Sequence, residues 1–131
     1  MRRSDWHDRM WQTVDAHRDI AFDWAQANCC QFAIAVADAM TDGDISAEVA
    51  SICSSEEAVA RHLEETGGLV NALARLYGEP DNVRPQRGDL VVLESPIGPA
   101  AGVWVGNVAL VMTKVGVTEY PRSSIIAQWS I

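Results

Sequence analysis

The spacing of apolar residues changes once along this chain, at a loop with two prolines between Glu79 and Gln86. Before this loop, apolar residues recur every three or four positions, which is typical of amphipathic helices. After Arg87-Gly88-Asp89 they alternate or run continuously, which is typical of strands. We therefore expect an α+β fold, with N-terminal helices (about 4–78) packed on a C-terminal antiparallel sheet (about 88–131). The 131 residues fit a single domain spanning 1–131.

The individual elements follow from the same patterns. Helices are expected at about 4–19, 29–40, 54–65 and 69–77, the first capped by Ser4. Residues 45–54 fit either a loose helical turn or a loop. Strands are expected at about 90–94, 102–105, 108–113 and 117–120, with Gly106-Asn107 as a two-residue turn. The tail, 123–131, should pack back on the core.

The second of these helices begins with a cysteine. Asn28 is a good N-cap, and Gln31, three residues later, can complete a variant of the capping box. Cys29 then occupies the first helical position, where unpaired N–H groups and the helix dipole favour negative charge. We expect a lowered thiol pKa there, and hence a candidate nucleophile.

Composition excludes several classes of function. The net charge of −8 argues against nucleic acid or an anionic membrane as the main partner. No apolar run is long enough to cross a bilayer, so we expect no membrane insertion, and the start of the chain lacks a secretory signal, which indicates synthesis in a cytoplasm. The three cysteines, Cys29, Cys30 and Cys53, fit neither a disulfide framework nor zinc-ligand spacing. We expect no metal and no cofactor.

The motifs and their order resemble the NlpC-type cell-wall peptidases, papain-like enzymes that cut the peptide stems of peptidoglycan. Their usual order is Trp-Gly, Asp-Cys-Ser-Gly-Phe, Gly-Asp-Leu-Val and His-Val-Gly-Ile-Tyr-Val-Gly. The matching stretches here are Trp24-Ala25, Asn28-Cys29-Cys30-Gln31-Phe32, Gly88-Asp89-Leu90-Val91 and Ala100-Ala101-Gly102-Val103-Trp104-Val105-Gly106.

The chain is more similar still to a small, functionally unassigned family encoded in the tail modules of long-tailed bacteriophages. The shared features are an opening helix with Trp, a Trp-x-x-x-Asp/Asn-Cys-Cys-x-Phe core, an Ala-Met-Thr helix end, a Gly-Gly turn and a final Trp-x-Ile. They correspond here to Asn28–Phe32, Ala39-Met40-Thr41, Gly67-Gly68 and Trp129-Ser130-Ile131.

One departure from the peptidase pattern bears on activity. The family's base is a histidine at the head of the second strand, and Ala100 occupies that position here. No histidine follows His62, so a base would have to come from His62 or from another subunit. Without a base and an acid, Cys29 is better interpreted as an inherited fold feature, with both adjacent thiols filling tight space beside the sheet. Trp104 suits a protein interface if exposed, or the core if buried.

These features lead to two main hypotheses and one fallback. The preferred one is a structural or assembly component of a phage tail, at the tip or hub, built on a degenerate peptidase fold. Its partners would be tail hub or tip proteins and possibly peptidoglycan, and it would be made in the host cytoplasm and assembled into the virion tail. The alternative is an active cysteine endopeptidase that cleaves peptidoglycan peptides as DNA enters the cell. The fallback is a small-molecule or lipid-binding module that uses the same groove.

Overall fold

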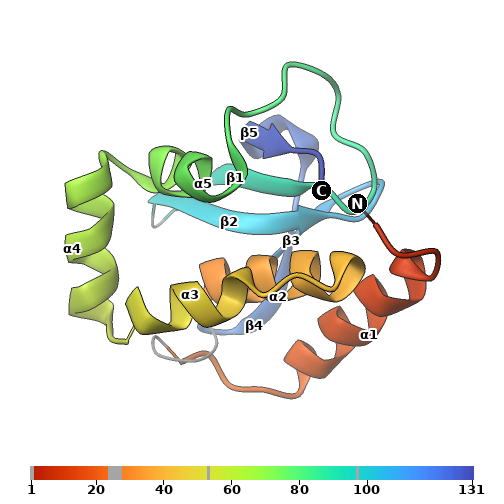
Figure 1. Cartoon of the computed structure of the whole chain (residues 1–131), viewed down its shortest axis with the longest axis horizontal. Helices are drawn as coiled ribbons and strands as arrows, with labels where there is room; N and C mark the ends of the chain where they lie inside the picture. Colours follow the sequence, from red (N-terminus) through yellow and green to blue (C-terminus); the bar gives the residue numbers. More distant parts are fainter. Residues whose placement is uncertain (1, 24–27, 53, 97) are drawn as a thin grey trace.

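The computed structural model describes residues 2–23, 28–52, 54–96 and 98–131. Within them, all five α-helices precede the first strand, which confirms the expected α+β order (Figure 1). The helices are α1 (Trp6–Arg18), α2 (Cys29–Thr41), α3 (Ile45–Ile52), α4 (Glu56–Thr66) and α5 (Leu69–Tyr77). The strands are β1 (Leu90–Ser95), β2 (Gly98–Trp104), β3 (Ala109–Thr113), β4 (Gly116–Tyr120) and β5 (Ile125–Trp129), with a 3₁₀ turn, η1 (Arg122–Ser124), before the last.

The strands form one antiparallel sheet in the order β4-β3-β2-β1-β5. Helix α2 packs against α1 and α3 on one side and against β2 and β3 on the other. In Figure 1, β1 and β2 run across the view whereas β3 and β4 run nearly down it, so the sheet is strongly coiled. Coiling of this kind makes one face of the sheet concave, so that apolar side chains on that face are buried against one another.

Alternating residues of the strands divide the apolar core in two. The helix-facing cluster takes Leu90 and Val92 from β1, whereas the opposite face takes Val91 and Leu93. Both sets are buried, which explains why these strands look continuously apolar in the sequence. The strands β2 and β3 contribute to both clusters with the same period of two.

Gly102 permits the close approach of β2 and β3. A Cβ placed on this residue would lie 2.6 Å from the carbonyl oxygen of Leu110 and 2.9 Å from Cγ2 of Val111. Neither neighbour can move freely, because one is strand backbone and the other is a buried side chain. A glycine is therefore required where β2 and β3 approach each other this closely.

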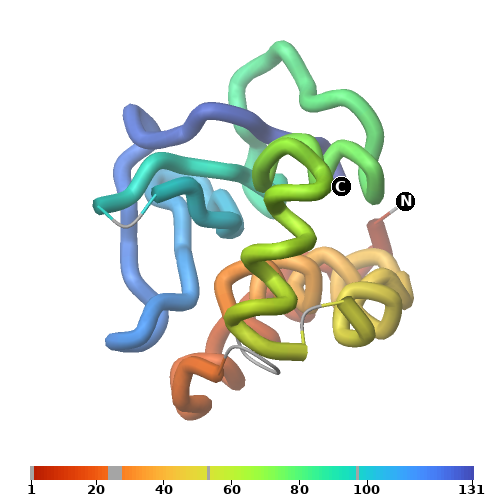
Figure 2. Tube along the Cα trace, turned by 90° about the vertical axis from the view of Figure 1, so that its left-hand side faces the viewer, coloured from red at the N-terminus to blue at the C-terminus, as the bar shows by residue number. Residues whose placement is uncertain are grey.

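Arg2 ties the two ends of the chain together. Its Nε donates to the main-chain oxygen of Ile131 at 2.6 Å, and one Nη donates to the carbonyl of Arg87 at 2.8 Å. The other Nη pairs with Asp89, whose side chain is 2% exposed, at 3.0 Å. The two ends lie close together in both views (Figures 1 and 2).

Several expected boundaries need correction. Ser4 does not cap α1: Asp5 occupies the N-cap position, and its carboxylate binds Arg9 at 2.9 Å and caps no N–H. The ambiguous stretch 45–54 contains a helix, α3, because the Asp38 carboxylate accepts hydrogen bonds from the N–H groups of Ile45 (3.3 Å) and Ser46 (2.8 Å). That cap comes from a different helix, so no local pattern could show it.

The sheet half also differs in two places. Strand β2 begins at Gly98, four residues before the expected start, and these four residues pair with β1 although none has a β-branched side chain. The tail packs on the core as expected, but it does so as an edge strand, β5, antiparallel to β1. The expected Trp24-Ala25 pair and Cys53 lie outside the described residues.

Candidate functional site

The start of α2 has the geometry that the sequence indicates. Asn28 is the N-cap, and its Oδ1 accepts a hydrogen bond from the N–H of Gln31 at 2.8 Å. Oε1 of Gln31 accepts one in return from the N–H of Asn28 at 3.5 Å, which completes the capping box. Both side chains are buried, so Cys29 at the first helical position is held by a closed polar arrangement.

The surroundings of Cys29 do not activate its thiol. Burial raises the pKa of the Cys29 thiol above its ordinary value, because a thiolate would lose hydration. Hydrogen bonds to the backbone of Ala101, Cys30 and Cys29 itself act in the opposite direction, but their effect on the pKa is smaller. The expectation of a lowered pKa is therefore wrong: the helix terminus is present, but desolvation outweighs it.

Strand β2 faces this sulfur with alanines. Cys29 packs against the second apolar cluster, which contains Ala100 and Val111. Ala100 is 5% exposed and lines the same cavity as Cys29. In the part of the chain that the structure describes, no hydrogen bond joins the Cys29 sulfur to a histidine ring. The strand thus presents a methyl group at Ala100, and the neighbouring strand β3 lines the cavity with Val111, Met112 and Thr113.

Cys29 lies at the wall of a cavity of about 500 Å³. Helices α2 to α5 and strands β1 to β4 all contribute to its walls. Most of the lining is apolar, for example Ile34, Val49 and Leu73. Such a lining suits an apolar ligand or the side chains of a partner better than it suits a charged reaction centre.

His62 of α4 is half-buried and lines this cavity, as do both adjacent thiols. His62 therefore lies on the face of α4 that is turned toward the cavity. Cys29 and Cys30 are both half-buried. The structure thus brings Cys29, Ala100 and His62 to one cavity.

The side chain of Trp104 is buried, so the exposed alternative of the two expectations is wrong. Its side chain is 6% exposed and packs in the second apolar cluster with Val91 and Ala109. An interface formed by a fully exposed Trp104 is therefore ruled out, since the tryptophan points into the coiled side of the sheet. Only its margin reaches a second hollow, at the other end of β2 from Ala100.

Sequence reasoning missed a buried hydroxyl behind the cysteine pair. The Tyr77 hydroxyl is buried and has no hydrogen-bond partner among the described residues. Burial, followed by the charges of Asp38 and Cys30, raises the pKa of Tyr77 well above its usual range. Nothing in the local sequence could identify this group, since α5 simply reads as amphipathic.

The described residues contain neither a candidate metal site nor a helix that could span a membrane. Within residues 2–23, 28–52, 54–96 and 98–131, no group of three or more His, Cys, Asp and Glu side chains could hold a metal ion. No helix in the same ranges combines the length and the apolar character needed to cross a membrane.

The fold and site thus define an α+β domain with a cysteine-opened helix beside a mainly apolar cavity. The chain belongs to the family described as Domain of unknown function (DUF6950), which matches residues 1–131. None of the curated proteins matches the sequence.

Proposed function

We propose that the chain is a non-catalytic structural or assembly component of a bacteriophage tail, at the tip or hub, built on a degenerate NlpC-type (papain-like) fold. One observation carries the non-catalytic part: the Cys29 thiol packs beside Ala100 of β2, in surroundings that raise its pKa. The tail assignment is supported by the order and spacing of the motifs from Asn28 to the final Trp129-Ser130-Ile131.

The chemistry of peptide cleavage supports the non-catalytic reading. A thiol that hydrolyses a peptide needs a base to take its proton and an acid to protonate the leaving amine. Such acid–base assistance contributes roughly 10²–10⁴-fold in rate. Neither Ala100 nor the apolar run Ala109–Met112 of β3 can supply it. A raised pKa further reduces the thiolate fraction at neutral pH.

The cavity supports a binding role in place of catalysis. Its apolar walls could receive an anchoring side chain from a tail protein. The capping box at the start of α2 holds one edge of the cavity in place. The net charge of −8 keeps such a component away from nucleic acid inside the assembling particle.

Co-purification tests the tail assignment directly. A tagged chain co-expressed with the other tail genes should sediment with assembled tails, and deletion of its gene should stop tail formation. Presence only in unfinished tails would restrict the role to assembly. If the chain neither binds a tail protein nor is needed for tails, the proposal fails.

A second candidate, an active cysteine endopeptidase acting on peptidoglycan peptides, is favoured by one observation. His62 lines the same cavity as Cys29, so a ring nitrogen and a thiol face a common space. This arrangement would replace the family's sheet histidine with a helical one from α4.

Hydrolysis of purified stem peptides distinguishes the two candidates. The non-catalytic proposal expects the same background rate for the wild type, Cys29→Ala and His62→Gln. The peptidase candidate expects turnover in the wild type that both substitutions abolish. Cys30→Ala is the matched control, because it removes the neighbouring thiol and leaves Cys29 in place.

A further inference from the structure

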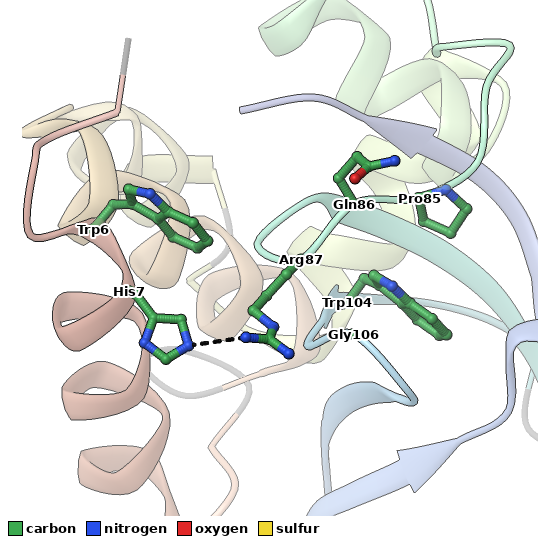
Figure 3. A pocket seen from close by; sticks show the side chains of 7 residues that line it. All are labelled: Trp6, His7, Pro85, Gln86, Arg87, Trp104 and Gly106. Carbon is green, nitrogen blue, oxygen red and sulfur yellow. Dashed lines mark hydrogen bonds between the residues drawn. The ribbon is translucent and has the colours of Figure 1, made fainter.

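A second hollow of about 570 Å³ opens where α1 meets the loop before β1 and the end of β2. Figure 3 shows its lining: Trp6 and His7 on one side, Trp104 on the other, and Arg87 between them, with Pro85, Gln86 and Gly106 completing the wall. It is separate from the Cys29 cavity, with which it shares no lining residue.

The guanidinium of Arg87 is held in place by its neighbours. Its Nε donates to the carbonyl of Val105 at 3.2 Å, and Nη1 lies 3.4 Å from Nε2 of His7. Its Nη2 has no acceptor among the described residues. A Cβ on Gly106, whose φ is +110°, would lie 3.0 Å from both Nε and Nη2, so the guanidinium rests directly on a glycine turn. The side chain is therefore oriented before any ligand arrives.

The backbone around Arg87 is equally fixed. The N–H of Gly88 donates to the carbonyl of Trp104 at 2.7 Å, and the N–H of Trp104 donates to the carbonyl of Asp89 at 3.0 Å. Trp6 lies against Gly88, where a Cβ would be 3.1 Å from the indole. Two glycines with positive φ thus allow one indole and one guanidinium to approach the backbone closely.

The nearest buried carboxylate does not neutralise Arg87. Asp89 pairs with Arg2 at 3.0 Å and accepts the N–H of Gln86 at 2.8 Å. Arg2 in turn covers the Trp6 ring, with its Cζ 4.4 Å from the ring centroid. The described residues that line the hollow include the Arg87 guanidinium and no carboxylate, so the hollow is locally positive, although the whole chain carries a charge of −8.

We propose that this hollow binds a carboxylate that is attached to a flat or apolar group. The carboxylate pairs with the Nη groups of Arg87, in the planar geometry that guanidinium favours. The attached group lies between Trp6 and the exposed margin of Trp104, where aromatic contact adds to the ion pair. Both a small aromatic acid and the C-terminal end of a peptide present this chemistry. The proposal does not depend on the tail role or on Cys29.

Titration with benzoate, followed by the indole N–H signals of Trp6 and Trp104 in ¹⁵N NMR spectra, tests the proposal. Trp6→Phe assigns the Trp6 signal. We expect saturable shifts with benzoate and at least tenfold weaker binding of benzamide, which has the same shape without the charge. Inorganic phosphate should also bind at least tenfold more weakly, because it lacks the flat group. Equal binding of benzamide or of phosphate would overturn the proposal.

Three variants distinguish binding in the hollow from a general effect of surface charge. Arg87→Gln should weaken benzoate binding at least tenfold, whereas Arg84→Gln, an exposed arginine of the same loop outside the hollow, should change it less than twofold. Arg87→Lys keeps the charge but loses the planar fork, so it should weaken binding severalfold even if Arg87→Gln fails to fold. Unchanged binding in the folded Arg87 variants would contradict the assignment.

A peptide acid compared with its C-terminal amide then identifies the source of the carboxylate. Tighter binding of the peptide acid than of benzoate, lost in the amide, indicates a protein chain end. Binding of benzoate as tight as that of the peptide acid indicates a small acid.

Discussion

Replacement of Arg2 by Gln should destabilise the fold more than any exposed ion pair can. The substitution removes three hydrogen bonds and leaves the Asp89 carboxylate, 2% exposed, without its cation. Removal of one partner of a fully buried pair costs roughly 3–5 kcal/mol. Because Arg2 is 20% exposed, water can partly reach the site, and we expect a loss of about 2–3 kcal/mol.

The expected change in melting temperature follows from the chain length. An unfolding entropy of about 2.1 cal/mol/K per residue gives roughly 0.3 kcal/mol/K for this chain. The loss expected for Arg2→Gln therefore lowers Tm by about 7–10 °C. Arg3→Gln is the matched control, because Arg3 and Asp42 are both 51% exposed and such pairs contribute only about 0–1 kcal/mol.

The pKa of Asp89 determines how the stability loss of Arg2→Gln should change with pH. Burial, the largest influence, raises the pKa of Asp89 above its unfolded value. Between the unfolded and the folded pKa, the folded chain binds more protons, so stability rises as pH falls through that window. Loss of the Arg2 cation raises the pKa of Asp89 further, so the deficit of Arg2→Gln should be largest at neutral pH and shrink in acid.

Equilibrium denaturation at neutral and acidic pH measures these effects, and Asp89→Asn completes a double-mutant cycle. The double variant should be more stable than Arg2→Gln alone, because the uncompensated charge is gone. The reasoning is refuted if Arg2→Gln costs no more than Arg3→Gln, or if Asp89→Asn gives no relief.

Three further substitutions test the fold by denaturation. Gly102→Ala should destabilise by about 1–3 kcal/mol, since its Cβ would lie 2.6 Å from the carbonyl oxygen of Leu110; a neutral effect would contradict the close approach of β2 and β3. Asn28→Ala should cost about 1 kcal/mol through loss of the α2 cap, whereas Asn28→Asp should retain most of the stability; equal losses would contradict the capping role. Trp129→Phe should cost roughly 1–3 kcal/mol, because the indole N–H of Trp129 donates to the carbonyl of Gly78 at 2.8 Å and phenylalanine leaves that carbonyl without its partner. An unchanged denaturation midpoint would show that water replaces the bond.

The elements with local signals could be predicted from the sequence. The α5 boundaries were predicted because a Gly-Gly turn precedes the helix and Gly78 follows it, and the α2 start because Asn28 and Gln31 form a capping box within four residues. The elements that depend on distant partners could not be predicted. Helix α3 is capped by Asp38 of α2, and β5 becomes a strand only because the β1 edge is available to it.

In the candidate site, too, the features with local signals could be predicted and those that depend on the fold could not. That Cys29 opens a helix follows from neighbouring residues, and the methyl group at Ala100 follows from motif order. The direction of the Cys29 pKa shift does not, because desolvation depends on how the walls of the cavity close around the sulfur. Arg87 could not be linked to His7, 80 residues away, since only the fold brings α1 to the loop before β1.

The reactivity of Cys29 across pH tests the central claim most directly. Alkylation by iodoacetamide would be followed by peptide mapping in a Cys30→Ala/Cys53→Ala background, so that Cys29 is the only thiol of the chain. The account predicts a rate that rises with pH, with a single inflection above the ordinary thiol pKa, unchanged by His62→Gln. An inflection below neutrality that His62→Gln removes would show a working thiolate–imidazole pair and contradict the account.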